Sequence, residues 1–213
     1  MKRRFGLLLS MLLGCLHLAA ADSPVTQQWN FRVFLDDKEI GRHSFSLQKS
    51  ADLTRVTSTA RFDVKVLFIN AYQYQHDDQE LWREDCLTSM AARTNDNGKL
   101  LSVRAVEQAA GIKVITEKQQ LDLSGCVMSF AYWNPVMLRQ TRLLNAQTGE
   151  YEPVTIQALG TTTLRAVGKE WSARQYKLTG RKLQIDLWYS PEGQWLALES
   201  TTENGRRLRY VLS

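Results

Sequence analysis

One short run of the chain, His76-Asp77-Asp78-Gln79-Glu80, gathers residue types that bind metal ions or transfer protons. Side chains alternate between the two faces of a β-strand, so His76, Asp78 and Glu80 would share one face. An imidazole and two carboxylates could ligate a divalent ion, and paired carboxylates could support hydrolysis. Such runs are more often solvated strand ends or turns. These three residues are therefore weak candidates for a metal site, and a metal-dependent hydrolase ranks last among three functions.

The rest of the chain carries no signature of a known catalytic centre. There is no G-x-S-x-G nucleophile elbow, no P-loop and no glycine-rich dinucleotide turn after a strand. Outside the N-terminal leader the chain has two histidines, His43 and His76. Serine or cysteine nucleophiles would thus lack a spare base in a recognisable setting. The sequence favours a non-catalytic protein, and we predict no cofactor.

The N-terminus has the pattern of a secretory signal peptide. Met1–Arg4 is basic, Phe5–Leu18 is apolar, and Ala19-Ala20-Ala21 matches an A-x-A cleavage site. We therefore predict a signal peptide over residues 1–21 and one exported β-rich domain over 22–213, periplasmic or secreted.

Cys15 allows a second interpretation of the leader, which is lipidation. Leu12-Leu13-Gly14-Cys15 loosely matches a bacterial lipobox. The residues after Cys15 continue the apolar run, whereas a lipoprotein usually turns polar at once. Simple cleavage is preferred, and a lipoprotein anchored through Cys15 is the alternative.

The predicted mature chain is nearly neutral. The full sequence has 27 basic and 22 acidic residues, and cleavage removes three basic ones, leaving 24 against 22 and a formal charge of +2. Much of the basic pI belongs to the leader, so we predict no nucleic-acid partner. No later segment approaches about 18 uncharged apolar residues, so we predict no transmembrane span in the mature chain.

Two cysteines remain after cleavage, Cys86 and Cys126. In an oxidising compartment an even pair is read first as a disulfide, and two cysteines allow one connectivity. The bridge would close a loop of 39 intervening residues, worth roughly 3–4 kcal/mol in the chain-entropy picture. The competing interpretation is a free reactive thiol, but nothing local supplies the histidine or helix N-terminus that would activate it.

A hairpin within Leu183–Ser200 organises the predicted fold. Apolar residues occupy every second position of Leu183–Tyr189, and Ser190–Gln194 has turn-forming residues. The register that brings the apolar residues of both strands together places Tyr189 opposite Leu196.

Further turns extend this hairpin into a five-stranded meander. A two-residue turn at Gly180-Arg181 would pair Leu178 with Leu183. The predicted strands of the meander are Thr161–Val167, Trp171–Thr179, Leu183–Tyr189, Trp195–Ser200 and Arg206–Leu212.

These registers direct three indole rings, those of Trp171, Trp188 and Trp195, to one face of the sheet. They could pack under other elements of the core, or they could line an apolar cavity with the sheet as its floor. Our tentative ligand-binding residues are these three and Trp133.

Period-two alternation also runs through the first half of the chain, with one exception. The predicted strands there are Trp29–Leu35, Arg42–Gln48, Thr54–Asn70, Ala71–Arg83, Leu87–Thr94, Lys99–Glu107, Ile112–Glu117, Gln119–Leu123 and, later, Glu152–Leu159. The exception begins at Asn134-Pro135, an N-cap followed by proline, which predicts one short helix over about 135–144. The fold class is all-β: an antiparallel meander forming a strongly curved or barrel-like sheet.

Several segments together resemble a known but uncharacterised family. They are WNFRVFLDDKEIGRHSFSL, YQYQHDDQELWREDCLTSMAARTNDNG, FAYWNPVMLRQTRLLNAQTGE and DLWYSPEGQWLALES. The chain resembles, over nearly all of its mature length, a family of exported bacterial proteins, domain-of-unknown-function family 6134. The resemblance implies an exported, envelope-located β-rich protein and assigns no catalytic residues. The resemblance leads us to expect a small turn residue at the position of Cys86. The cysteine at this position implies that the disulfide is a feature of a subgroup of the family.

Two functions rank above the metal-dependent hydrolase. The first is a non-catalytic periplasmic binding or carrier module for an apolar, lipid-like ligand. The second is an interaction or assembly factor whose sheet edge or aromatic face docks on another envelope protein. An enclosed void beside Trp188 would favour the first, and a flat exposed apolar patch would favour the second.

Overall fold

The computed structural model describes residues 25–66, 69–202 and 204–213. The predicted signal peptide over residues 1–21, the Cys15 alternative and the start of the mature chain lie outside the described residues.

Thirteen strands form one antiparallel sheet, in the order β11-β12-β13-β14-β15-β1-β2-β3-β4-β5-β6-β7-β8. Each strand pairs with its neighbours in sequence except at the join between β15 and β1, so the sheet is a meander. Its strands are β1 (Val25–Leu35), β2 (Lys38–Ser50), β3 (Leu53–Val66), β4 (Ile69–Arg83), β5 (Cys86–Asp96), β6 (Lys99–Gln108), β7 (Gly111–Thr116), β8 (Gln120–Ser124), β11 (Thr155–Ala166), β12 (Lys169–Thr179), β13 (Gln184–Tyr189), β14 (Trp195–Thr201) and β15 (Arg207–Leu212).

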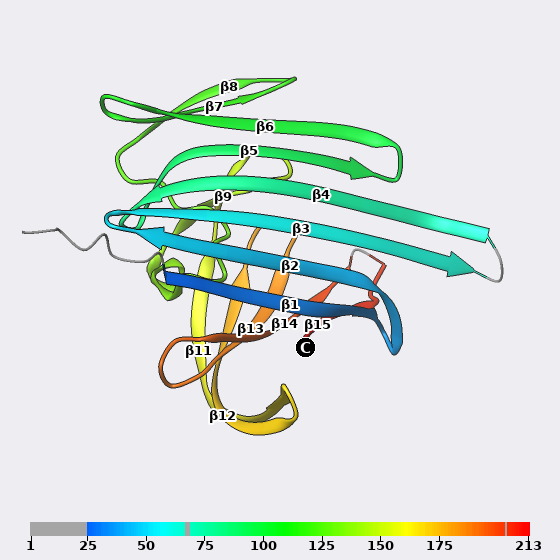
Figure 1. The fold of residues 1–213 in the computed structure, drawn as a ribbon. Helices are drawn as coiled ribbons and strands as arrows, with labels where there is room; N and C mark the ends of the chain where they lie inside the picture. Colours follow the sequence, from blue (N-terminus) through cyan, green and yellow to red (C-terminus); the bar gives the residue numbers. More distant parts are fainter. Residues whose placement is uncertain (1–24, 67–68, 203) are drawn as a thin grey trace, which may run out of the picture.

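The sheet is strongly curved but not closed, since β8 and β11 stand at opposite ends of the strand order. Figure 1 shows the long strands β1–β6 as one layer, with β11–β14 crossing on the other side. Alternation explains why a core forms between them: along β1, the side chains of Trp29, Phe31 and Val33 are buried and those between them are exposed. The predicted all-β, curved, barrel-like class is confirmed.

Residues 125–154, here called the cover segment, lie between β8 and β11 in sequence and pack on the concave side of the sheet. Met128, Leu143 and Leu144 are buried in the same core as Trp29 and Leu187. The segment contains the short two-stranded sheet of β9 (Arg142–Leu144) and β10 (Tyr151–Pro153). It therefore fills the space that the open sheet would otherwise leave to solvent.

The predicted helix over 135–144 is wrong in extent and type. The N-cap is as expected, because the Asn134 side chain accepts a hydrogen bond from the Val136 backbone. The helix is a single 3₁₀ segment, η1 (Pro135–Arg139), that ends at Gln140 in extended conformation. Leu143 and Leu144 are both fully buried in β9, and tertiary packing here overrides the helical pattern. Elsewhere, too, the described residues contain nothing with the length and hydrophobicity of a membrane-crossing helix.

The meander is present, but a β-bulge alters its central hairpin. Trp188 pairs with Ala197 as predicted, whereas Tyr189 pairs with Trp195 instead of Leu196. One extra residue on β14 therefore lies between Trp195 and Ala197. Because of it, Trp195 points to the face opposite to the predicted one. The prediction that Trp171, Trp188 and Trp195 share a face is therefore wrong.

The turn between β12 and β13 is also longer than predicted. Gly180 donates a backbone hydrogen bond to Leu183, and Leu178 pairs with Ile185 rather than with Leu183. The shift of two residues preserves which side chains share a face.

The disulfide between Cys86 and Cys126 is present. It joins the first residue of β5 to the start of the cover segment, next to a backbone hydrogen bond from Leu87 to Val127. The bridge thus fixes one end of the cover segment to the sheet.

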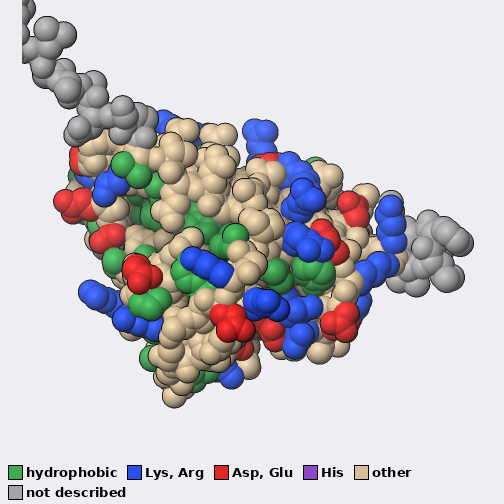
Figure 2. All heavy atoms as spheres, turned by 60° about the horizontal axis from the view of Figure 1, so that its bottom comes forward, with side chains coloured by type: hydrophobic (Ala, Val, Ile, Leu, Met, Phe, Trp, Pro, Cys, Tyr) green, Lys and Arg blue, Asp and Glu red, His purple; other side chains and the backbone are tan. Residues whose placement is uncertain are grey.

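The face of the molecule in Figure 2 mixes basic and acidic side chains, with hydrophobic side chains visible between them. No single sign of charge dominates this face, in keeping with the small formal net charge of residues 22–213.

Candidate functional site

The His76–Glu80 run lies in the middle of β4 and not at a solvated strand end. His76, Asp78 and Glu80 share the concave face, as alternation predicts, and are 7%, 6% and 6% exposed. Tyr74 and Trp82 continue the same row. A phenol, an imidazole, two carboxyls and an indole thus follow one another along one buried strand face.

A cavity of about 240 Å³ adjoins this row. One side is the concave sheet surface, and the other is the cover segment. The sheet contributes His43, Phe45, Val56, Ser58, Tyr74, His76, Asp78, Glu80 and Tyr210; the cover segment contributes Ser129, Phe130, Ala131, Tyr132, Trp133, Asn145, Ala146 and Gln147; the β12–β13 turn contributes Leu183.

Small side chains on β3 explain why the sheet is recessed at this point. Ala60 pairs with His43 on one side and His76 on the other, and Ser58 stands between Phe45 and Asp78. Because β3 has only a methyl and a hydroxymethyl group here, the larger side chains of β2 and β4 face each other across open space.

Asp78 and Glu80 form a buried pair of carboxyl groups. Burial, and after it the negative charge of the neighbouring Glu80, raises the pKa of Asp78 to about 9. Burial also raises the pKa of Glu80. Glu80 accepts a hydrogen bond from the indole nitrogen of Trp82, at 2.9 Å. The pair retains a proton at neutral pH, as expected for two acids removed from water.

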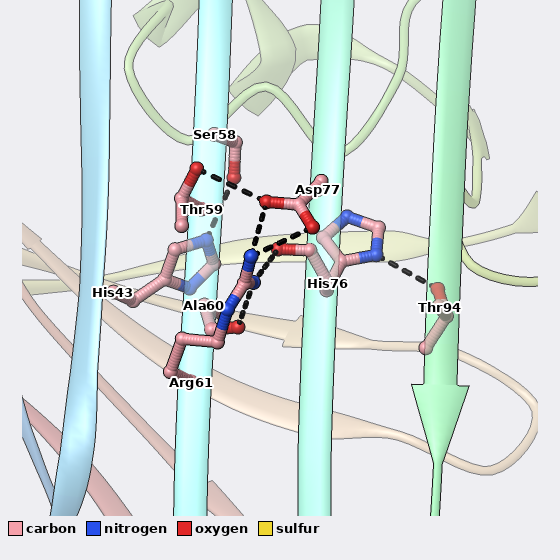
Figure 3. Close-up of polar contacts among 8 residues, drawn as sticks. All are labelled: His43, Ser58, Thr59, Ala60, Arg61, His76, Asp77 and Thr94. Atoms are coloured by element: carbon pink, nitrogen blue, oxygen red, sulfur yellow. Dashed lines mark hydrogen bonds and ion pairs between the residues drawn. The ribbon is translucent and has the colours of Figure 1, made fainter. Parts of the chain in front are cut away.

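Both histidines in the cavity wall are neutral. In His43, Nε2 lies 2.7 Å from the Ser58 hydroxyl and Nδ1 lies 3.3 Å from the Tyr210 hydroxyl. In His76, Nδ1 lies 2.8 Å from the Thr94 hydroxyl (Figure 3). Burial lowers the pKa of His43 to about 3 and that of His76 to about 4. The Nε2 atom of His76 has no hydrogen-bond partner among the described residues, so it can donate to or accept from a molecule in the cavity.

An ion pair on the outer face braces the strands behind these histidines. The Arg61 guanidinium contacts both carboxylate oxygens of Asp77, at 2.7 and 2.8 Å. Arg61 also donates to the backbone oxygens of Ala60 and His76 (Figure 3). Asp77 is exposed and points away from the cavity, so it is a matched control for Asp78.

The four tryptophans proposed as ligand-binding residues separate in space. Trp133 lines the cavity, with its ring centroid 5.4 Å from that of Trp82. Trp195 lies one layer behind, in contact with the walls, and Trp188 projects from the other face. Trp171 donates its indole hydrogen bond to a backbone oxygen next to the β11–β12 turn, away from the cavity.

Over the described parts of the chain, no group of three or more His, Cys, Asp or Glu side chains is placed to hold a metal ion. His76 and Glu80 are four residues apart on an extended strand, so their Cα atoms are roughly 13 Å apart. Although the side chains of His76 and Glu80 share a face of the sheet, they are thus too far apart to bind the same ion.

Several cavity residues were not among the predicted site residues. Tyr132 and Ser129 belong to the cover segment, whose path the sequence does not reveal. Tyr210 and His43 enter from distant strands, and pairing of the chain ends through β15 and β1 brings them together. Tyr74 differs from these four residues. It lies two positions before His76 on the same strand, so alternation alone predicts that the two side chains share a face.

Known proteins resemble this chain in fold and family. The crystal structure of a β-barrel-like protein of domain of unknown function DUF1849 from Brucella abortus superposes with a TM-score of 0.65 at 11% identity, covering 89% of this chain and 95% of that one. At that identity the likeness shows a shared fold alone. No curated protein matches the chain significantly. Residues 31–213 match the domain of unknown function DUF6134, and the chain belongs to that family.

Proposed function

We propose that this protein is a binding module for a small amphipathic molecule, which occupies the cavity between β4 and the cover segment. The observation that carries the proposal is a roofed cavity with aromatic walls and buried titratable groups. Pockets that combine aromatic and apolar walls with placed polar groups are typical of ligand sites.

The buried carboxyls argue against a purely structural role for this region. Burying an acid costs free energy unless it is fully hydrogen-bonded or paired. Asp78 lies beside a second acid, and its Oδ1 atom has no hydrogen-bond partner among the described residues. An apolar pair at these positions would stabilise the fold more, so a use for the acids other than stability is the better explanation.

The walls define what the ligand resembles. The aromatic rings that face the cavity favour a ring or a short acyl chain, which keeps the lipid-like body in the proposal. The polar side chains of β4 need hydrogen-bond partners, so the other end of the ligand carries a polar group. A volume of about 240 Å³ lies slightly below the range of roughly 300–1,000 Å³ for drug-sized ligands, so the bound part is small.

The proposed location is the bacterial periplasm, and a carrier role is compatible with it. The leader pattern at the N-terminus supports export. The disulfide between Cys86 and Cys126 supports it too, because disulfides form and persist in oxidising compartments. The curved sheet and the cover segment would hold the ligand between them.

Native mass spectrometry of protein purified from its own cells tests the proposal. We expect wild type to retain a small-molecule adduct. Ala146→Trp, which fills the cavity from the cover side, should lose the adduct. Ala91→Trp, on the exposed face of β5, is the matched control and should keep it. An adduct that survives Ala146→Trp would place the ligand elsewhere.

A further inference from the structure

The charged groups facing the cavity are of one sign. Asp78 and Glu80 line it, while none of the described lining residues is Lys or Arg. The two imidazoles that also line it are uncharged at neutral pH because burial lowers the pKa of each. Any charge inside the cavity is therefore negative, and the protein itself provides no counter-ion there.

One acceptor in this cavity lacks a donor. Asp78 is 6% exposed, and its Oδ1 atom is buried with no hydrogen-bond partner in the described chain. Glu80, by contrast, accepts a hydrogen bond from the Trp82 indole nitrogen at 2.9 Å. The unfilled position is thus on Asp78, and a ligand with a hydrogen-bond donor would fill it.

Aromatic rings border the cavity on both the sheet side and the cover side. Six rings border the cavity: Phe45, Tyr74, Phe130, Tyr132, Trp133 and Tyr210. The negative faces of such rings attract cations, most strongly where water is excluded. Aromatic walls and a carboxyl floor together are complementary to a positively charged nitrogen on an apolar body, and poorly complementary to an anion.

We propose that the ligand carries a protonated amine that binds at Asp78, with its apolar part among the aromatic rings of the sheet and of the cover segment. This inference rests on the binding function proposed above and names its ligand class.

Binding would then be linked to proton release. An ammonium group that donates to Asp78 replaces the proton which Asp78 shares with Glu80, so that this proton leaves to solvent as the amine enters. The titratable groups facing the pair are His76 from β4, His43 from β2 and the tyrosine hydroxyls of the wall, none of which changes charge between pH 6 and 8. Affinity for an amine should therefore increase from pH 6 to pH 8.

Isothermal titration calorimetry with three matched probes tests the inference. The probes are 2-phenylethylamine, 2-phenylethanol and 3-phenylpropionate, which are alike in size and differ in charge. We expect the amine to bind most tightly, and to release protons when the titration is repeated in buffers of different ionisation enthalpy. Asp78→Asn should weaken amine binding about tenfold or more, the range for a lost charge-assisted hydrogen bond. Asp77→Asn, on the outer face, should leave it unchanged.

Each outcome decides a different point. Equal or tighter binding of the alcohol or the carboxylate would overturn the amine assignment and leave the binding function standing. Amine binding that Asp78→Asn and a second variant, Glu80→Gln, both leave intact would also overturn it. If no probe binds, the amine assignment fails, and the adduct measured by native mass spectrometry decides separately whether the cavity holds any ligand.

Discussion

The protonated carboxyl pair predicts an unusual dependence of stability on pH. Asp78 keeps its proton in the folded protein up to about pH 9, whereas in the unfolded chain it ionises near pH 3.9. Between these values the unfolded state binds fewer protons than the folded state. The free energy of unfolding therefore falls as pH rises through this window.

The histidines act in the opposite direction and in a different range. Their pKa values in the folded protein, about 3 for His43 and about 4 for His76, lie below the unfolded value of about 6.5. The unfolded state binds more protons in acid, so they destabilise the fold below about pH 6.5 and are silent above pH 7. Above pH 7 the carboxyl pair dominates.

One proton corresponds to about 1.4 kcal/mol per pH unit. Between pH 7 and 8.5 wild type should therefore lose about 2 kcal/mol of unfolding free energy. Urea unfolding, followed by circular dichroism at several pH values, measures this loss. Asp78→Asn should lose less than half as much, and Asp77→Asn should follow wild type. If the unfolding free energy of wild type does not change between pH 7 and 8.5, the carboxyl pair does not hold its proton. The same conclusion follows if the unfolding free energy of Asp78→Asn falls with pH as steeply as that of wild type.

Three further substitutions test the framework around the site. Replacing both Cys86 and Cys126 by alanine should lower the unfolding free energy by roughly 3–4 kcal/mol; an unchanged urea midpoint would show that the bridge does not constrain the chain. Trp82→Phe removes a donor to the buried Glu80 and should cost about 1–3 kcal/mol, and a melting temperature equal to wild type would contradict that hydrogen bond. Gly41→Ala should cost about 2 kcal/mol or more, because the added Cβ would overlap a backbone carbonyl of β3. Normal expression and melting of that variant would disprove the close approach.

The candidate site was partly visible in the sequence. Period-two alternation is a local property of the chain, so the shared face of His76, Asp78 and Glu80 followed from spacing alone. The burial of that face did not follow. It depends on the cover segment and on β15, which reach β4 only through tertiary structure.

The errors in the fold have similar causes. The predicted register, with Tyr189 opposite Leu196, assumes a hairpin without a bulge, and a bulge is not encoded in the turn residues. The Trp195 ring instead packs against Phe31, which comes from the opposite end of the chain. The two ring centroids are 4.3 Å apart. The predicted strands Thr54–Asn70 and Ala71–Arg83 correspond to β3 and β4, but the predicted boundary between them lies too late in the chain. Val64–Ile69 has none of the Gly, Pro or Asn that usually mark a turn, so the sequence gives no signal for the true boundary.

The most direct test of the central claim uses the two imidazoles of the mature chain as reporters. A ¹H–¹⁵N spectrum of the histidine side chains at pH 7 should show both rings neutral. Adding 2-phenylethylamine should move the His76 signals in wild type and leave them unmoved in Ala146→Trp. Imidazoles that titrate near pH 6.5, or His76 signals that shift equally in wild type and in Ala146→Trp, would contradict a ligand cavity on β4.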